Sequence, residues 1–253
     1  MPNLKLEIEY DGTRFYGWQV QNCQKARLKY NASRTIQNIL EQTLKKILQE
    51  DIKLIVAGRT DSGVHALSQV ANFKTGSKIP LDKLRWGLNC LLPEDIKVSR
   101  VKKVPLDFNS RFSAKSKVYR YTILNRKYSS ALSAKHLYFF PHHLDIGLIR
   151  REAKALVGKH NFKSFQASEQ RERNPVRAIK SIKISRDKNL LHIDIEADSF
   201  LYNMVRNIAG TLLEIGRGRF AEGSMSKILE SRNRTCAGPT LPAKGLCLMK
   251  VRY

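Results

Sequence analysis

The order in which strand-like and helix-like segments follow one another is the feature that most constrains this chain. Apolar and charged residues alternate in some segments, and in others the apolar residues recur on one helical face. Strands are expected at residues 4–10, 52–56, 67–73 and 96–104, and helices at residues 36–48 and 80–88. The first 107 residues therefore predict the order β-α-β-β-α-β.

The rest of the chain repeats this order. Strands are expected at residues 118–124, 176–184, 191–197 and 246–251, and helices at residues 146–156, 201–215 and 224–229. In residues 191–197 apolar and polar side chains alternate strictly, which is typical of a strand with one face in water. The sequence thus predicts an α+β protein with two ferredoxin-like halves, residues 1–107 and 108–253. We expect their sheets to join around a central basic cleft that binds RNA.

The charge of the chain points to a polyanionic partner. Its 46 Lys and Arg face 22 Asp and Glu, which leaves a net charge of +24. In a compact chain so many positive charges repel one another, and binding to a nucleic acid would relieve that repulsion. The simpler alternative is a basic surface that is only solvated. The cations are spread along the chain, with local clusters at residues 25–29, 171–177, 217–219 and 232–234. This distribution favours a broad phosphate-binding surface over a basic tail.

Several other classes of protein fit the sequence poorly. No uncharged apolar run has the length of a membrane span, and the first residues read as a strand and not as a secretion signal. We therefore expect a cytoplasmic protein without a membrane partner. The cysteines, Cys23, Cys90, Cys236 and Cys247, form no close pair and are expected to be reduced and mostly buried. His142 and His143 are adjacent but belong to no metal-binding pattern, so no metal is expected.

The densest signal is the loop at residues 57–66, between two expected strands. Gly58 and Gly63 bracket Arg-Thr-Asp-Ser, so the backbone can turn tightly and hold Asp61 outward. The hydroxyls of Thr60 and Ser62 are nearby donors that could fix its carboxylate. The alternative is a turn in which Asp61 only caps its own backbone.

A second reading of this loop is an aspartic protease, because Asp61-Ser62-Gly63 is also the short signature of that class. That chemistry needs two carboxylates that share one proton. The chain contains no second Asp-Thr/Ser-Gly, so two copies would have to form the site. The length and charge of the chain fit such a dimer poorly.

The loop Gly58–Ala66 resembles the active-site motif of the tRNA pseudouridine synthase A family. Six further stretches match that family in the same order along nearly the whole chain. They are Tyr10–Gly12 with Tyr16–Gln19, Arg111–Ala114 with Tyr119–Tyr121, Phe200–Gly210, and Pro242–Leu246.

The resemblance implies a function and a set of residues. The substrates would be uridines at positions 38 to 40 of the anticodon stem-loop of tRNA, isomerised by a homodimer without a cofactor. Asp61 would be the nucleophile, and Arg59 would help to place the target nucleotide. Tyr119 would stack on the uracil, and Arg206 would pair with the catalytic carboxylate.

Three of these residues also have ordinary explanations. Arg59 could simply bind phosphate, and Tyr119 shares a strand face with apolar residues, which is typical of a core position. Arg206 lies off the apolar stripe of its helix, so pattern alone makes it an exposed residue. Gly210, one turn further on the same face, would however allow a close approach of another segment.

The chain departs from the family pattern in two places. Residues 22–34 form a longer segment than usual, and its Lys25, Arg27, Lys29 and Tyr30 suggest a loop that faces RNA. Asn161 stands where the family usually has Asp, which puts any role of charge at that position in doubt. A non-catalytic RNA-binding protein is the main alternative function, although the chain lacks the aromatic signature of the commonest RNA-binding module.

Overall fold

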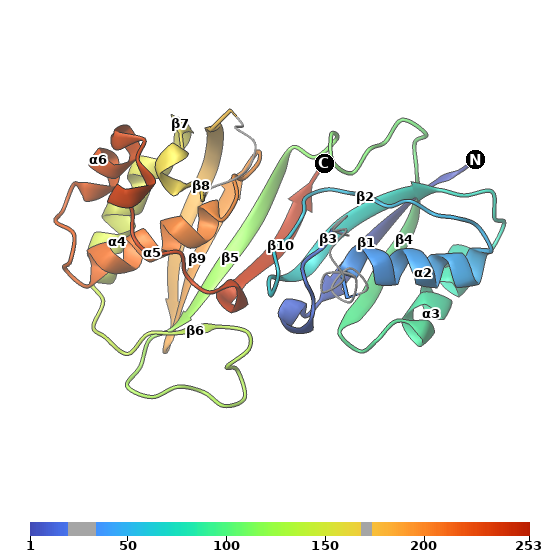
Figure 1. The fold of residues 1–253 in the computed structure, drawn as a ribbon, viewed down its shortest axis with the longest axis horizontal. Coiled ribbons are helices and arrows are strands. Elements are labelled where there is room, and N and C mark those ends of the chain that lie inside the picture. Colours follow the sequence, from blue (N-terminus) through green and yellow to red (C-terminus); the bar gives the residue numbers. More distant parts are fainter. Residues whose placement is uncertain (20–33, 168–173) are drawn as a thin grey trace, which may run out of the picture. The chain divides into compact units, whose positions relative to one another are not determined.

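The computed structural model describes residues 1–19, 34–167 and 174–253, and these form two compact units. Unit 1 comprises Met1–Lys115 with Leu248–Tyr253, and unit 2 comprises Ser116–Cys247 (Figure 1). The boundary predicted after residue 107 lies within unit 1. Residues 22–33 of the longer basic segment, with Cys23, and residues 171–173 of a second basic cluster lie outside the described residues.

Unit 1 contains the predicted order of elements. They are β1 (Asn3–Tyr10), α2 (Ile36–Leu48), β2 (Ile55–Val56), β3 (His65–Lys74), α3 (Leu81–Leu91) and β4 (Ile96–Val104), with the short 3-10 helix η1 (Gly12–Arg14) after β1. β1 pairs antiparallel with both β3 and β4, and β2 pairs antiparallel with β3. The spatial order β4-β1-β3-β2 is that of a ferredoxin-like half, so this prediction is confirmed.

β2 is shorter than the strand predicted at residues 52–56. Leu54 is buried, but its backbone N–H donates to Glu41 Oε1 of α2 at 2.9 Å and not to a neighbouring strand. Only Ile55 and Val56 pair with β3. At Leu54 a hydrogen bond to a side chain of α2 thus takes the place of a backbone hydrogen bond to a neighbouring strand.

The two helices of unit 1 bury the apolar faces that the sequence predicts. α2 begins after Thr35, whose side chain accepts from the N–H of Asn38 at 3.4 Å, and ends where Gln49 adopts a left-handed φ of 56°. α2 buries Ile36, Leu40, Leu44 and Leu48, and α3 buries Leu84 and Leu88. The two helices contact each other, as Figure 1 shows.

The prediction of mostly buried thiols is wrong for the described cysteines. Cys90 and Cys236 are exposed, and Cys247 is half-buried. In α3 the buried face is set by Leu84 and Leu88, and Cys90 follows Leu88 by two residues, about 200° further round the helix. Cys90 therefore points away from the core.

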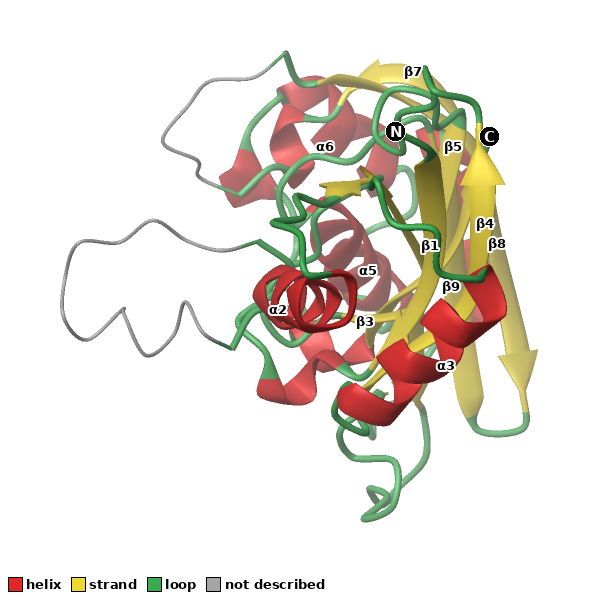
Figure 2. Ribbon diagram, turned by 90° about the vertical axis from the view of Figure 1, so that its right-hand side faces the viewer, coloured by secondary structure: helices red, strands yellow, loops and turns green. Residues whose placement is uncertain are grey.

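Unit 2 also follows its predicted order, with two additional short strands. Its elements are β5 (Ser116–Leu124), β6 (Tyr138–Phe139), α4 (Ile146–Ala153), β7 (Gly158–Asn161), β8 (Val176–Asp187), β9 (Leu190–Ala197), α5 (Met204–Gly216) and α6 (Ser224–Ser231), and β10 (Leu246–Arg252) begins here and ends in unit 1. β9 pairs antiparallel with β5 and β8, and β8 with β7. α4, α5 and α6 contact one another, and Figure 2 shows α5 and α6 on one side of the strands.

β9 of unit 2 has one buried and one wet face, as predicted. In β9, Leu191, Ile193, Ile195 and Ala197 are buried, whereas the residues between them are half-exposed. On the wet face Arg120 of β5 forms a two-pronged ion pair with Asp194, at 2.7 and 2.9 Å. Across the described residues, no helix is both long and apolar enough to cross a membrane.

Asn161 performs a local role that needs no charge. It ends β7, and its Oδ1 accepts from the backbone N–H of Lys163 at 3.0 Å, where a short 3-10 helix begins. An amide oxygen accepts this bond as an aspartate would. The departure from the family pattern at this position is therefore compatible with the same turn.

Candidate active site

The loop that carries Asp61 joins β2 to β3 in unit 1. The N–H of Val64 donates to the carbonyl of Asp61 at 3.1 Å, and Gly63 has a φ of +77°, a conformation that favours glycine. Gly58, the other glycine of the motif, is not left-handed. Asp61 is half-buried and Arg59 is exposed. The loop is therefore a closed turn that leaves Arg59 exposed and Asp61 half-buried.

The hydroxyls of Thr60 and Ser62, on either side of Asp61, bond residues outside the loop. Thr60 is 6% exposed and its Oγ1 bonds the Tyr10 hydroxyl at 2.7 Å, while Ser62 Oγ donates to the carbonyl of Phe15 at 3.2 Å. Both hydroxyls thus anchor the loop to the segment that precedes it in sequence. That they also fix the carboxylate of Asp61 stays a prediction.

The N-terminal stretches of the family resemblance form a support behind this loop. A Cβ on Gly12 would collide with the carbonyl of Val64, and one on Gly17, whose φ is +82°, would lie 2.7 Å from the carbonyl oxygen of Thr60. That same oxygen accepts from the N–H of Trp18 at 3.0 Å. Only glycine allows backbones to approach this closely, so these positions explain why the two stretches accompany the loop.

A buried glutamine that sequence reasoning missed also contacts the loop. Gln69 of β3 is 0% exposed, and its Nε2 donates to the carbonyl of Gly58 at 2.8 Å and to the Tyr10 hydroxyl at 3.3 Å. The available signal was a polar residue within an apolar strand. Its partners were not visible, because Tyr10 lies 59 positions earlier in the sequence.

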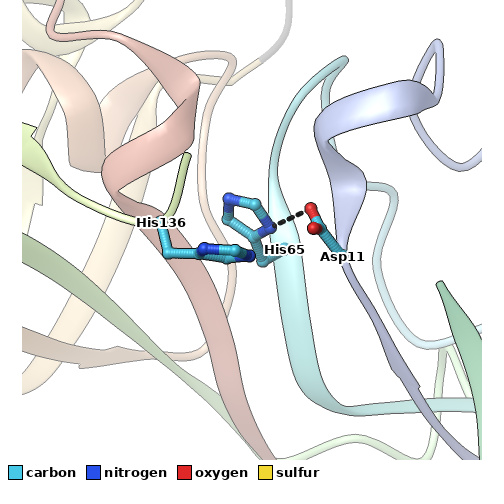
Figure 3. A group of neighbouring side chains, drawn as sticks. All are labelled: Asp11, His65 and His136. Carbon is cyan, nitrogen blue, oxygen red and sulfur yellow. Dashed lines mark ion pairs between the residues drawn. The ribbon is translucent and has the colours of Figure 1, made fainter. Parts of the chain in front are cut away.

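His65 fixes the other end of the loop to η1. It is the first residue of β3, and its Nδ1 lies 3.1 Å from Asp11 Oδ1, the pair drawn with a dashed line in Figure 3. The N–H of Gly12 also lies 3.1 Å from this nitrogen. The last part of the motif, Val64–Ala66, is therefore tied to the Tyr10–Gly12 stretch through side chain and backbone.

Tyr119 lies in unit 2, on the buried face of β5. It is 7% exposed, and its ring meets that of Phe200 edge to face at a centroid distance of 5.1 Å. Tyr121 follows on the same face and donates to the carbonyl of Pro242 at 2.7 Å. A Cβ on Gly245 would lie 2.6 Å from the Tyr121 ring, so the closing stretch Pro242–Leu246 packs directly on β5.

Arg206 is half-buried on α5 and not the exposed residue that its pattern alone suggests. Its Nε donates to the carbonyl of Leu241 and its Nη1 to Oδ1 of Asn203, each at 2.6 Å. The N–H of Leu241 donates back to the carbonyl of Arg206 at 3.4 Å. The guanidinium is therefore held by two acceptors, one from a residue before Arg206 in the sequence and one from a residue after it.

Gly210 makes this arrangement possible, as predicted. A Cβ at this position would collide with the carbonyl of Pro239, so the segment that carries Leu241 reaches α5 only because residue 210 has no side chain. The same segment is tied down by Asn207, which is 0% exposed and accepts from Arg234 Nη2 at 3.1 Å and from the Thr240 hydroxyl. Burial lowers the pKa of Arg234 from its ordinary value.

The four candidate residues are thus divided between the units. Asp61 and Arg59 belong to one loop of unit 1, and Tyr119 and Arg206 belong to β5 and α5 of unit 2. The Asp61 loop in unit 1 and Arg206 in unit 2 are each supported by polar bonds and by glycines that permit close backbone contact. Chemically, the chain offers a carboxylate, an aromatic ring and two guanidinium groups.

An α+β architecture with an aspartate on a supported loop is compatible with an enzyme that uses a carboxylate. Comparisons with known proteins identify the family within this class of enzymes. The family described as tRNA pseudouridine synthase matches residues 7–113 and 153–253. Proteins called tRNA pseudouridine synthase A are similar over the full length of both chains: 44% identical in Caldicellulosiruptor saccharolyticus, 43% in Thermoanaerobacter sp. and 44% in Clostridium kluyveri. The chain belongs to the tRNA pseudouridine synthase A family.

Proposed function

We propose that this chain isomerises uridine to pseudouridine at positions 38 to 40 of the anticodon stem-loop of tRNA, with Asp61 as the nucleophile. The observation that supports this most is the 44% identity, over the whole of both chains, with a protein called tRNA pseudouridine synthase A. The rigid support of the Asp61 loop is consistent with it, because a nucleophile must be held in place to react efficiently.

The proposed reaction needs no cofactor because nothing enters or leaves overall. The N1–C1′ bond breaks, the base turns, and a C5–C1′ bond forms while the proton at C5 is lost and N1 gains one. A carboxylate can bond to the nucleotide and later leave it, which divides one difficult step into two easier ones. The target base must first leave its stack, at a cost of a few kcal/mol.

We assign supporting roles to three further residues. Arg59 is exposed next to Asp61 and would help to place the flipped nucleotide. Tyr119 would stack on the uracil, a contact worth about 1–3 kcal/mol per base. In the described part of the chain Arg206 uses two of its five N–H donors on Leu241 and Asn203, so others are available to pair with the carboxylate of Asp61 and keep it ionised.

The remaining features of the proposal concern the partner and its surroundings. The net charge of +24 supports a tRNA substrate bound through many phosphates. We propose that the chain acts in the cytoplasm, and that it forms a homodimer, which the family resemblance implies. The basic cleft expected between the halves stays a prediction.

The test is pseudouridine formation in unmodified tRNA by the native chain and by Asp61→Asn, with tRNA affinity measured for both. Asp61→Asn keeps the shape of the side chain and removes its negative charge. We expect the reaction to disappear while tRNA affinity stays within about twofold, since the carboxylate itself adds nothing to phosphate binding. Asp51→Asn is the matched control, because Asp51 is an exposed carboxylate paired with Lys45. A native chain that binds tRNA without modifying it would instead indicate an RNA-binding protein.

A further inference from the structure

We propose that Gln69 and Tyr10 are positioning residues for Asp61, which they hold in place through Thr60 and Gly58. This inference rests on the proposed function, since it concerns the geometry of the proposed nucleophile. Neither residue is part of the loop. Gln69 belongs to β3 and Tyr10 ends β1, so the frame of unit 1 would set the position of the carboxylate.

The directions of the hydrogen bonds that Gln69 makes follow from the groups involved. The carbonyl of Gly58 can only accept, so the group of Gln69 that faces it must be the NH₂, and the N–H of Val70 donates to the Gln69 Oε1 on the other side at 3.1 Å. The second N–H of that NH₂ then donates to the Tyr10 oxygen. The Tyr10 hydroxyl and Thr60 Oγ1 share a hydrogen bond of 2.7 Å, of which either oxygen can be the donor.

These bonds fix the loop at the residues that flank Arg59. Gln69 holds the carbonyl of Gly58, Tyr10 holds the side chain of Thr60, and the N–H of Trp18 holds the carbonyl of Thr60. Thr60 is therefore fixed through its side chain and its backbone, immediately before Asp61. A displacement of about 1 Å at a reacting group can cost roughly a hundredfold in rate.

A buried polar chain could also serve stability alone, and β3 offers a matched comparison. Asn72 is 2% exposed in the same strand and, like Gln69, it has both ends of its amide bonded. It donates to Asn3 Oδ1 at 3.0 Å and accepts from the N–H of Ser110 at 2.8 Å. Its partners lie outside the Asp61 loop, so it contributes buried bonds without reaching the proposed nucleophile.

The experiment compares Gln69→Met, Tyr10→Phe and Asn72→Leu with the native chain. Each variant removes polar atoms and roughly keeps the size of the side chain. The measurements are the single-turnover rate of pseudouridine formation, tRNA affinity, and thermal unfolding. We expect Gln69→Met and Tyr10→Phe to slow the reaction by about 10- to 100-fold with tRNA affinity unchanged within about twofold. Asn72→Leu should lower the unfolding temperature and leave the rate of the folded protein within about twofold.

The double variant separates one shared effect from two independent ones. If the bonds act in series, Tyr10→Phe combined with Gln69→Met should react no more slowly than Gln69→Met alone. Tyr10→Phe removes a single oxygen and tests the inference even if Gln69→Met does not fold. Equal rate losses for Gln69→Met and Asn72→Leu, or a native rate in Tyr10→Phe, would overturn the positioning role.

Asp61→Asn, measured alongside, distinguishes this failure from that of the proposed function. A native chain without activity on tRNA would overturn both proposals. An active Asp61→Asn variant would overturn the nucleophile and, with it, the positioning inference. If the native chain is active, Asp61→Asn is inactive and Tyr10→Phe reacts at the native rate, only the positioning inference fails.

Discussion

Arg206 and Leu241 exchange two hydrogen bonds: the guanidinium Nε donates to the Leu241 carbonyl at 2.6 Å, and the Leu241 N–H donates to the Arg206 carbonyl at 3.4 Å. The first bond orients the side chain and the second fixes the segment that provides its acceptor. Since Leu241 lies 35 positions after Arg206, the long stretch between them has to fold before the guanidinium is held. The direction of this side chain is therefore a property of unit 2 as a whole.

Asn203 supports Arg206 from the other side, and its substitution separates two contributions. Its φ of 57° is left-handed, and its Oδ1 accepts from Arg206 Nη1. Asn203→Gly keeps this backbone conformation and loses the acceptor, whereas Asn203→Ala loses the acceptor and adds strain of about 1–2 kcal/mol. We expect both variants to lose activity by about tenfold or more, because one bond to a charged group is lost. Asn203→Ala should be the less stable of the two variants in urea unfolding, because only it adds strain, and a native rate in Asn203→Gly would contradict the role of the amide.

Gly210 and Gly87 allow a test of close packing, because both lie within helices. A Cβ on Gly210 would collide with the carbonyl of Pro239, whereas a Cβ on Gly87 would lie 3.6 Å from Ile47 Cδ1, an ordinary contact. We expect Gly210→Ala to lower the free energy of unfolding by about 1–3 kcal/mol. Gly87→Ala should instead be neutral or stabilising by up to about 1 kcal/mol, because alanine favours the helix. If the two substitutions changed the free energy of unfolding equally, the segment of Pro239 would be able to move away from residue 210 at no cost.

The elements of both units could be predicted from sequence because their patterns are local. Periodicity gives the face of α2 and the alternation of β9 without knowledge of their partners. β6 and β7 escaped prediction because they have two and four residues, too few for a pattern. β2 was overestimated because a side chain of α2 replaces part of its ladder.

The candidate site was predictable only where its residues form a motif. Asp61 and Arg59 lie in one dense loop, and Arg206 lies in a stretch that the family resemblance marks. The supports of these residues depend on bonds between distant positions, such as Gln69 with Tyr10 and Asn207 with Arg234. Such partners are set by the folded chain. In the sequence, the only sign of these supporting residues was a polar residue within an apolar strand or helix.

His192 should make the stability of the fold depend on pH. It lies on the wet face of β9, and burial, together with the charge of Arg120, lowers its pKa below the ordinary value of 6.5. Above pH 6.5 the imidazole is neutral in both states and contributes nothing. As the pH falls below 6.5, the unfolded chain takes up the proton first, so the free energy of unfolding decreases until the folded pKa is passed.

The measurement for His192 is urea unfolding of the native chain and of His192→Gln at about pH 7.5 and pH 5.5, on either side of an ordinary histidine pKa. We expect the native chain to lose more stability on acidification than the variant does. The glutamine is neutral at both values and is of similar size, so other groups titrate equally in both proteins. A larger loss in His192→Gln would mean that the imidazole is stabilised when it is charged.

The cations of the longer segment, Lys25, Arg27 and Lys29, lie outside the described residues, and their role can be tested through salt. Each phosphate contact contributes about 0.7–0.9 to the slope of log affinity against log salt. If all three contact tRNA, changing them to Gln should flatten that slope by roughly 2–3 and weaken binding most at low salt. The control is the same change at Lys46, Lys53 and Lys74, which are exposed in unit 1. This control variant loses the same net charge. Since long-range attraction depends on net charge and direct contacts depend on position, equal slopes for the two triple variants would show that this segment does not face RNA.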